Sequence, residues 1–134
     1  MVDVEKARLL ILQNANELET EYVSIKNAIG RVLAEDVIAG EDIPAQNLSA
    51  MDGFAIKLPC NDECKIVGES KTESPFMGEI FQDEAVKVST GSILPKGSNA
   101  VVRNEDAEVS GDVVYIKRMP LEGRNIFTKG EEYE

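Results

Sequence analysis

The sequence predicts an α+β fold, in which a helical segment near the N-terminus is followed by a small barrel-like β lobe. Apolar residues between positions 4 and 18 recur on one helix face, whereas those beyond about position 46 come in short runs between turn residues. Several short strands at regular spacing are typical of a small barrel or sandwich. The 134 residues are enough for one ordinary domain or two small lobes.

The first predicted helix begins after Asp3, a candidate N-cap, and runs to about Leu18. The apolar residues on its predicted face are Val4, Ala7, Leu10, Ile11 and Leu18. The elements expected next are an extended piece at 22–25, a shorter helix around 26–33 that contains Gly30, and a strand at 34–39. Asp42-Ile43-Pro44 is expected to end this first segment of the chain.

The rest of the chain is expected to form six short strands. They are predicted near residues 54–57, 65–69, 85–88, 100–103, 107–109 and 113–117. Ser110-Gly111-Asp112 predicts a hairpin turn between the last two strands. Residues 71–78 are expected to form a loop, and the tail from Gly123 is expected to leave the barrel.

The composition limits the core and the partners. Tryptophan is absent and aromatic residues make up 5% of the chain, so the core is expected to be aliphatic. The net charge of −11 argues against binding nucleic acid or an anionic membrane. No stretch is apolar enough to span a membrane and the N-terminus lacks the layout of a signal peptide, so the expected compartment is the cytoplasm.

Cys60 and Cys64 are the two cysteines of the chain. A tetrahedral metal site needs more ligands, and no histidine is present to complete one. Reduced loop thiols are expected in the cytosol, with a local disulfide as the alternative.

Two polar turns predict the two rims of one site. Ser-Ala-Met-Asp-Gly at 49–53 leads into one apolar strand, and a second loop around Thr90-Gly91 precedes another. Gly53 can adopt a positive φ, and Asp52 can either ligate a cation or bond its own turn. The Thr90 hydroxyl and the Gly91 backbone could bind an oxyanion, or they could form an ordinary turn. Without histidine, a Ser-His-Asp nucleophile at Ser49 is excluded.

Together these segments resemble the N-terminal half of the molybdopterin molybdenumtransferase family, which includes MoeA and the gephyrin E domain. The matching motifs are Gly-Arg-Val-Leu-Ala-Glu-Asp-Val at 30–37, Asp-Ile-Pro at 42–44, Ser-Ala-Met-Asp-Gly-Phe-Ala at 49–55, Thr-Gly at 90–91, Leu-Pro at 94–95, Gly97, Ala-Val-Val at 100–102, Glu105, Gly123, Asn-Ile at 125–126 and Gly-Glu at 130–131. They occur in the family's order and span nearly all of the chain.

The resemblance implies a domain organisation. Residues 1–45 and 123–134 would form part of an elongated, helical and extended dimerisation lobe, and residues 46–122 a β-rich, barrel-like lobe inserted into it. The family's later molybdopterin-binding lobes would begin beyond Glu134. A homodimer is expected, and the 134 residues alone are not expected to turn over substrate.

The resemblance also implies a reaction, the Mg²⁺-dependent insertion of molybdate into adenylylated molybdopterin with release of AMP. This chain would supply one wall of the cleft, with no cofactor bound tightly to it. The implied roles are catalytic for Asp52 and Thr90, Mg²⁺-binding for Asp52, and substrate-binding for Ser49, Gly53, Gly91, Arg124 and Lys129. Whether the metal is molybdenum or tungsten is left open.

The chain departs from the family pattern at two places. Gln46-Asn47-Leu48 replaces an aromatic residue, an acidic residue and asparagine, and Phe127-Thr128-Lys129 replaces a run of arginines whose first member belongs to the active site. Lysine does not reproduce the bidentate grip of guanidinium, so Arg124 or Lys129 would have to compensate for the arginine missing at Phe127. The alternative hypothesis is a non-catalytic dimerisation or protein-interaction module.

Overall fold

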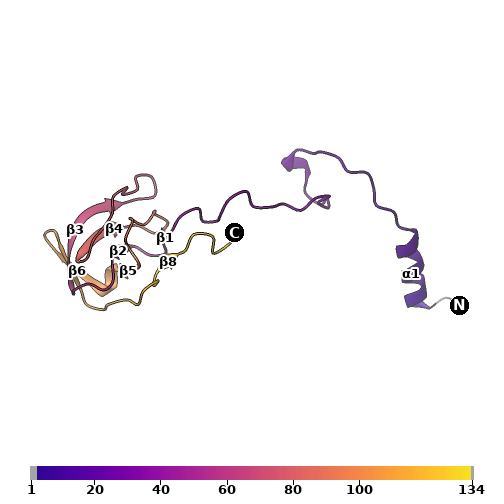
Figure 1. Ribbon diagram of the computed structural model, residues 1–134. Helices are drawn as coiled ribbons and strands as arrows, with labels where there is room; N and C mark the ends of the chain where they lie inside the picture. The colour runs from indigo at the N-terminus through magenta and orange to yellow at the C-terminus, as the bar shows by residue number, and fades with distance from the viewer. Residues whose placement is uncertain (1–2, 134) are drawn as a thin grey trace. The chain divides into compact units, whose positions relative to one another are not determined.

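The computed structural model describes residues 3–133 and divides the chain into two compact units, Met1–Ile38 and Ala39–Glu134 (Figure 1). The first unit contains helix α1 (Val4–Asn14) and the 3₁₀ turn η1 (Ile25–Asn27). The second contains β1 (Leu48–Ser49), β2 (Gly53–Ile56), β3 (Glu63–Ser70), β4 (Glu84–Val88), β5 (Ala100–Arg103), the 3₁₀ turn η2 (Asn104–Asp106), β6 (Ala107–Ser110), β7 (Val113–Ile116) and β8 (Ile126–Phe127).

The predicted α+β class with an elongated helical lobe is wrong, because the described residues are mostly β and include a single α-helix. That helix begins as expected, with the Asp3 carboxylate accepting a hydrogen bond from Lys6 N at 2.9 Å. It ends at Asn14 instead of near Leu18. Asparagine is a poor helix former, and the acidic residues at 17, 19 and 21 are unfavourable near a helix C-terminus.

The helix predicted around 26–33 and the strand predicted at 34–39 do not form. Gly30 takes a φ of 82°, outside the helical range, and only the turn η1 is helical in this stretch. Residues 34–39 pair with no strand within the described part of the chain. No residue of 3–38 is buried, so these segments lack the tertiary packing that stabilises most short elements.

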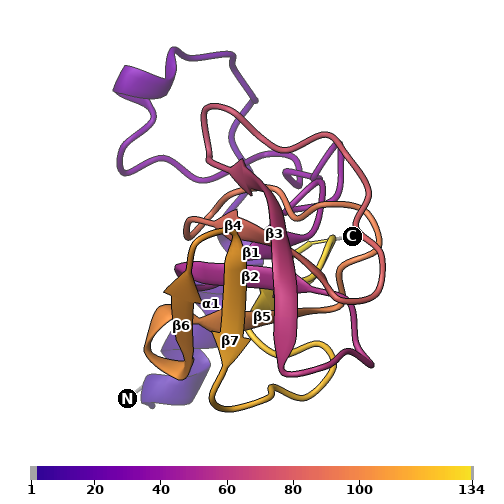
Figure 2. The same ribbon diagram turned by 90° about the vertical axis from the view of Figure 1, so that its left-hand side faces the viewer.

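Six strands of the second unit form one sheet in the order β5-β2-β4-β3-β7-β6. β3 and β4 are parallel, and every other neighbouring pair is antiparallel. The six predicted strands are confirmed to within a few residues at their ends, as is the turn at Gly111. Figure 2 shows β3, β7 and β6 side by side in front of β2, β4 and β5, so the sheet curves into the predicted barrel-like lobe.

Apolar clusters cover both faces of β2, β4 and β5. One consists of Phe54, Ile56, Cys64, Ala85, Ala100, Val102, Val114 and Ile116. The other consists of Ala55, Ile80, Val86, Val88, Leu94 and Val101. Since successive strand residues point to opposite faces, β2 can be buried along its whole length only because the loops carrying Ile80 and Leu94 cover its second face. Burial in the first cluster also raises the pKa of Cys64 to about 12, and both cysteines are free thiols.

Strands β1 and β8, which the sequence analysis missed, join the segments that lead into and out of the barrel. Leu48 pairs with Phe127, and Ser49 pairs with Ile126. Farther out, Ile43 N donates to Tyr133 O at 2.9 Å. The stretches 43–49 and 126–133 therefore run antiparallel along each other. Two-residue strands carry too little periodicity to be predicted.

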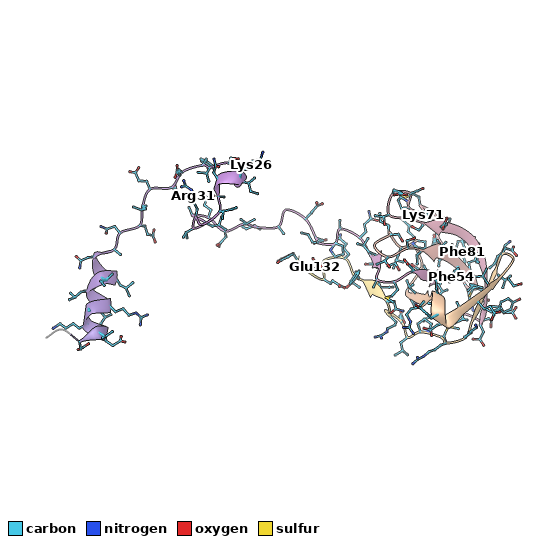
Figure 3. All side chains as sticks on the ribbon, turned by 180° about the vertical axis from the view of Figure 1, so that it is seen from behind. Lys26, Arg31, Phe54, Lys71, Phe81 and Glu132 are labelled. Atoms are coloured by element: carbon cyan, nitrogen blue, oxygen red, sulfur yellow. The ribbon has the colours of Figure 1, made fainter. Side chains whose placement is uncertain are left out.

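Many large apolar side chains of the first unit are exposed. They are Val4, Leu9, Leu10, Ile11, Leu12, Leu18, Tyr22, Val23, Ile25, Ile29, Val32, Leu33, Val37 and Ile38. Figure 3 shows Lys26 and Arg31 on the same unit, where Arg31 donates to the Glu21 carboxylate. Within the described residues, no helix is both long and apolar enough to cross a bilayer.

Gly53 is required by close packing and does not use the positive φ that was expected. It lies in the extended strand β2, opposite Arg103 of β5. A Cβ atom at this position would lie 1.9 Å from Val102 O. Backbone of a paired strand cannot move away from such a contact without breaking the ladder.

We therefore expect Gly53→Ala to lower the free energy of unfolding of the β unit by about 3 kcal/mol, as an overpacked core site does. Gly40→Ala is the matched control, because a Cβ atom there meets nothing within 4 Å. Urea unfolding followed by far-ultraviolet circular dichroism measures both. Equal midpoints for the two variants would contradict the close approach.

Candidate functional site

Asp52 connects the two candidate loops. Its Oδ1 atom accepts hydrogen bonds from Thr90 N at 2.7 Å and from Thr90 Oγ1 at 3.0 Å. Asp52 directly precedes β2 and Thr90 follows β4, and these strands pair with Gly53 opposite Val88. The strand register thus places two loops that are far apart in the sequence side by side.

The hydrogen bonds from Thr90 keep the exposed Asp52 side chain ionised. The bond from Thr90 N, and next the bond from Thr90 Oγ1, lower the pKa of Asp52 from its ordinary 3.8. Within residues 3–133 no donor bonds to Asp52 Oδ2. One oxygen of a carboxylate whose charged form is favoured therefore remains available to a ligand.

Ser49 and Gly91 support this junction through the backbone. Gly91 N donates to Ser49 O at 2.8 Å, and Ser49 N donates to Ser92 O at 2.9 Å. Gly91 has a φ of 78°, a conformation that favours glycine. The Ser49 side chain is fully buried, and its Oγ donates to Met51 O at 2.6 Å. Ser49 therefore holds its own turn and presents no free hydroxyl to solvent.

The two predicted cationic residues do not bond to the Asp52–Thr90 pair. Lys129 Nζ forms an ion pair with Asp42 Oδ2 at 2.9 Å, and Lys129 N donates to Asn47 Oδ1 at 2.8 Å. Arg124 is exposed, and its backbone carbonyl accepts a bond from Val101 N at 3.1 Å. Neither side chain contacts Asp52 or Thr90 by a hydrogen bond or ion pair in the described part of the chain.

A pocket of about 330 Å³ adjoins the Thr90 loop. Its walls are mainly apolar, from Ile43, Pro44, Leu48 and Phe127, and it also includes Thr90, Gly91, Glu131 and Glu132. Leu48 and Phe127 are direct partners across β1 and β8. Phe127 therefore stands where the family pattern has an arginine, and its cross-strand partner is the aliphatic residue Leu48.

A second pocket, of about 400 Å³, lies beside Lys129 and the loop at 94–98. Its polar side chains are those of Gln46, Asn47, Lys96, Ser98 and Lys129. Sequence reasoning did not assign any role to Lys96 or Asn47. No local sequence signal marks these two residues, because three separate segments of the chain come together to form this pocket.

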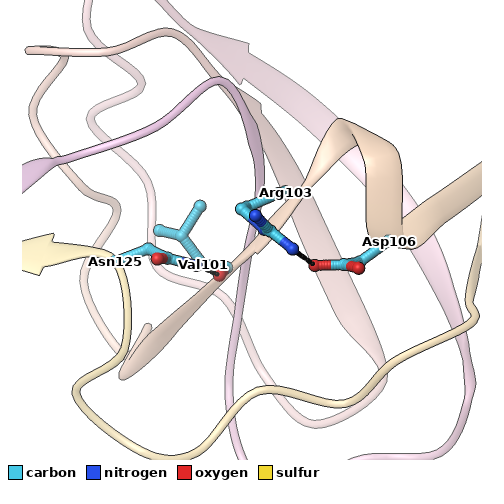
Figure 4. Close-up of polar contacts among 4 residues, drawn as sticks. All are labelled: Val101, Arg103, Asp106 and Asn125. Carbon is cyan, nitrogen blue, oxygen red and sulfur yellow. Dashed lines mark hydrogen bonds and ion pairs between the residues drawn. The ribbon is translucent and has the colours of Figure 1, made fainter.

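Asn125 is a further supporting residue that the sequence reasoning did not single out for a contact. It has a φ of 62°, and its Nδ2 donates to Val101 O at 2.8 Å (Figure 4). Its carbonyl accepts a hydrogen bond from Ala50 N at 3.0 Å. Figure 4 also shows Arg103 paired with Asp106, at 2.7 Å from Nη2 to Oδ2. Asparagine adopts a left-handed backbone more readily than most residues, so an asparagine two positions after Gly123 could have indicated this turn.

The Mg²⁺ that the resemblance implies needs hard oxygen ligands. Within the described residues no three acidic or cysteine side chains come close enough to form a metal site. Asp52 supplies one hard oxygen ligand. Mg²⁺ is commonly held by one or two carboxylates together with substrate phosphates and water, so Asp52 fits as one ligand of a site completed by other groups.

The sequence comparison decides the family. Residues 2–134 match the family described as the MoeA N-terminal region (domain I and II). The chain belongs to this family. The resemblance drawn from the Ala-Met-Asp-Gly and Thr-Gly motifs is thereby confirmed.

Known members of the MoeA family are similar over almost the whole chain. The molybdopterin molybdenumtransferase of Haemophilus influenzae is 30% identical over 137 residues, covering 98% of this chain and 34% of that protein. That of Staphylococcus epidermidis is 29% identical over 141 residues, covering 98% and 33%. A crystal structure of the molybdopterin biosynthesis MoeA protein from Pyrococcus horikoshii OT3 has a TM-score of 0.88 and 34% identity, covering 100% of this chain and 38% of that one. The chain therefore spans about a third of the length of these relatives.

Because the Thr90 bonds hold Asp52 in its charged form, Thr90→Val should raise the pKa of Asp52 part of the way back to 3.8. Valine removes the hydroxyl donor but keeps the backbone donor, which makes the larger contribution. A carboxyl whose pKa is lowered on folding stabilises the fold above its unfolded pKa, and this stabilisation is lost as the pH falls through the folded pKa. Carbon-detected NMR titration of Asp52 in both proteins measures the shift. An unchanged pKa would mean that the hydroxyl bond does not form.

Proposed function

We propose that this chain acts in molybdenum cofactor biosynthesis as the N-terminal part of a molybdopterin molybdenumtransferase, contributing one wall of the cleft that inserts molybdate into adenylylated molybdopterin. The observation that carries the proposal is the Asp52–Thr90 junction, which holds an ionised carboxylate at an exposed position with one oxygen open. Family membership over residues 2–134 supports the reaction class.

In this proposal Asp52 orients Mg²⁺ or the metal-bearing ligand through Oδ2, while Thr90 holds Oδ1. When bound, Mg²⁺ would neutralise anionic oxygens of the substrate, which a chain with a net charge of −11 otherwise repels. Gly53 and Gly91 position the two loops, and the Ser49 backbone joins them through its hydrogen bonds to Gly91 and Ser92. Arg124 and Lys129 would bind anionic groups of the substrate at positions away from Asp52 and Thr90, because neither side chain contacts that pair.

The proposed domain organisation follows the pairing of the chain's two connections. In this proposal residues 1–45 and 123–134 belong to one lobe and residues 46–122 form an inserted β lobe, although residues 39–45 and 123–134 fall within the compact unit Ala39–Glu134. The antiparallel run of 43–49 along 126–133 supports this division, because an inserted domain begins and ends at neighbouring positions. The later domains of the relatives would complete the cleft.

The proposal is tested by Asp52→Asn in the protein as purified from its native cell, with any domains or partner chains that it carries. The substitution keeps the shape of the side chain but removes its charge. The rate of molybdate insertion at limiting molybdate should fall by at least about tenfold, as loss of a group that orients a metal site does.

Asp112→Asn is the matched control, since Asp112 is exposed in the β6–β7 turn and the substitution changes the net charge equally. Its rate should stay within twofold of the parent rate. Insertion that is unaffected by Asp52→Asn, or lowered equally by both variants, would refute the role of Asp52.

We further propose that the N-terminal unit forms a homodimer interface. Ile11 is 69% exposed and Leu12 is 60% exposed on α1, and large exposed apolar side chains that gather on a surface mark interaction sites. The same exposed residues favour the second candidate function, a non-catalytic interaction module. A dimer without insertion activity, in the complete protein, would select that alternative.

Ile11→Asp should raise the dimer dissociation constant at least about tenfold, because it places a charge in an apolar interface. Met77→Asp is the matched control, as Met77 is 82% exposed on a loop of the β unit. Sedimentation velocity over a range of protein concentrations measures the dissociation constants. Identical association of the two variants, or a parent protein that is monomeric throughout, would contradict the interface.

A further inference from the structure

Ser70 is a fully buried polar residue at the end of β3. It lies opposite Val88 of β4, and Val88 in turn lies opposite Gly53 of β2. The three residues therefore form one row across the sheet, and Asp52 directly precedes the last of them. Ser70 thus stands beside the point at which β4 ends and the loop that carries Thr90 begins.

Ser70 is bonded to both ends of this loop, residues 89–93. Its carbonyl oxygen accepts a hydrogen bond from Ser89 N at 3.3 Å, where the loop begins. Its Oγ atom donates to Ile93 O at 2.7 Å, where the loop ends. The second bond belongs to the side chain, so the Ser70 hydroxyl fixes the point at which the loop returns toward the barrel.

The same hydroxyl also holds the loop at 71–78. Ser70 Oγ accepts a hydrogen bond from Phe76 N at 3.1 Å. The Phe76 ring packs against two glycines, because a Cβ atom at Gly68 would lie 2.5 Å from the ring and one at Gly78 would lie 2.6 Å from it. A serine hydroxyl can donate one hydrogen bond while it accepts another, so Ser70 links the Thr90 loop to a segment that is itself anchored.

Ser92 provides a comparison within the same loop. Its side chain is as fully buried as that of Ser70. Its Oγ atom, however, has no hydrogen-bond partner among residues 3–133. Burial is therefore common to the two serines, and the bonds to Ile93 and Phe76 distinguish Ser70.

We propose that Ser70 is a positioning residue of the Asp52–Thr90 junction, whose hydroxyl holds the Thr90 loop where Thr90 N and Oγ1 reach Asp52 Oδ1. Those two bonds span 2.7 and 3.0 Å, and a loop released at Ile93 would lengthen them. For its effect on catalysis the inference rests on the function proposed above, because Ser70 would act on the reaction only through Asp52.

The test is the hydrogen-exchange rate of the Thr90 backbone amide, measured by NMR in the isotopically labelled full chain. Ser70→Ala removes the bond to Ile93 O, so the Thr90 N–H should exchange about fivefold faster or more, as loss of one hydrogen bond allows. Amides within β2 and β4 should keep their rates to within about twofold, since the opening is local. An unchanged Thr90 rate, or equal acceleration throughout the sheet, would overturn the proposal.

Ser92→Ala is the matched control, because it removes an equally buried hydroxyl that has no partner within the described residues. Its Thr90 amide should exchange at the parent rate, and acceleration equal to that of Ser70→Ala would contradict the proposal. Ser70→Cys keeps a weaker donor of similar shape, so its Thr90 rate should lie between those of the parent and Ser70→Ala. If Ser70→Ala does not fold, equal Thr90 rates in Ser70→Cys and Ser92→Ala would overturn the proposal.

The insertion of molybdate by the complete protein separates this inference from the proposed function. Ser70→Ala should lower the insertion rate at least about fivefold, because misplacing a group that orients the reactants slows the reaction. Faster Thr90 exchange with an unchanged insertion rate would confirm the positioning by Ser70 and refute the role of Asp52 in the reaction. A lower insertion rate with unchanged Thr90 exchange would overturn the positioning.

Discussion

The close approach of β2 and β5 at Gly53 is the constraint on which the rest of the β unit depends. β2 lies between β4 and β5 and is buried on both faces, so it cannot shift without opening two apolar clusters. The absence of a side chain at Gly53 allows the β5 backbone to reach it. Because Asp52 directly precedes this strand, the same contact determines where the carboxylate stands relative to the Thr90 loop.

Hydrogen bonds, and not cations, control the charge of Asp52. Both bonds come from Thr90, and they favour the ionised form even though the side chain is exposed. An anionic ligand would therefore approach together with a cation or with a basic surface from elsewhere. The pocket beside Lys129 and the loop at 94–98 differs in character, because Lys96 and Lys129 line it and Asp42, which pairs with Lys129, is not among its lining residues. The Asp52 carboxylate suits a cation, whereas the lysine-lined pocket does not.

The two units differ in how much apolar surface they bury by themselves. The β unit buries both faces of its central strands, whereas residues 3–38 bury no side chain. Apolar residues that find no partner within a chain are stabilised by association, since burial supplies most of the driving force for folding. The chain covers about a third of the length of the relatives it matches, and in the proposed homodimer a second copy would cover this surface.

The sequence by itself determined the family, the strands of the barrel-like lobe and the presence of the two loops that carry Asp52 and Thr90. These are local signals, because turn residues and alternating apolar residues act within a few positions. It did not determine the fold class: the pattern at 26–39 resembled a helix and a strand, but nothing in the described chain packs against them. The pairing of β1 with β8 and the backbone bonds of Ser49 to Gly91 and Ser92 each join residues far apart in the sequence. Only the tertiary structure decides such contacts, because they depend on which segments the sheet register brings together.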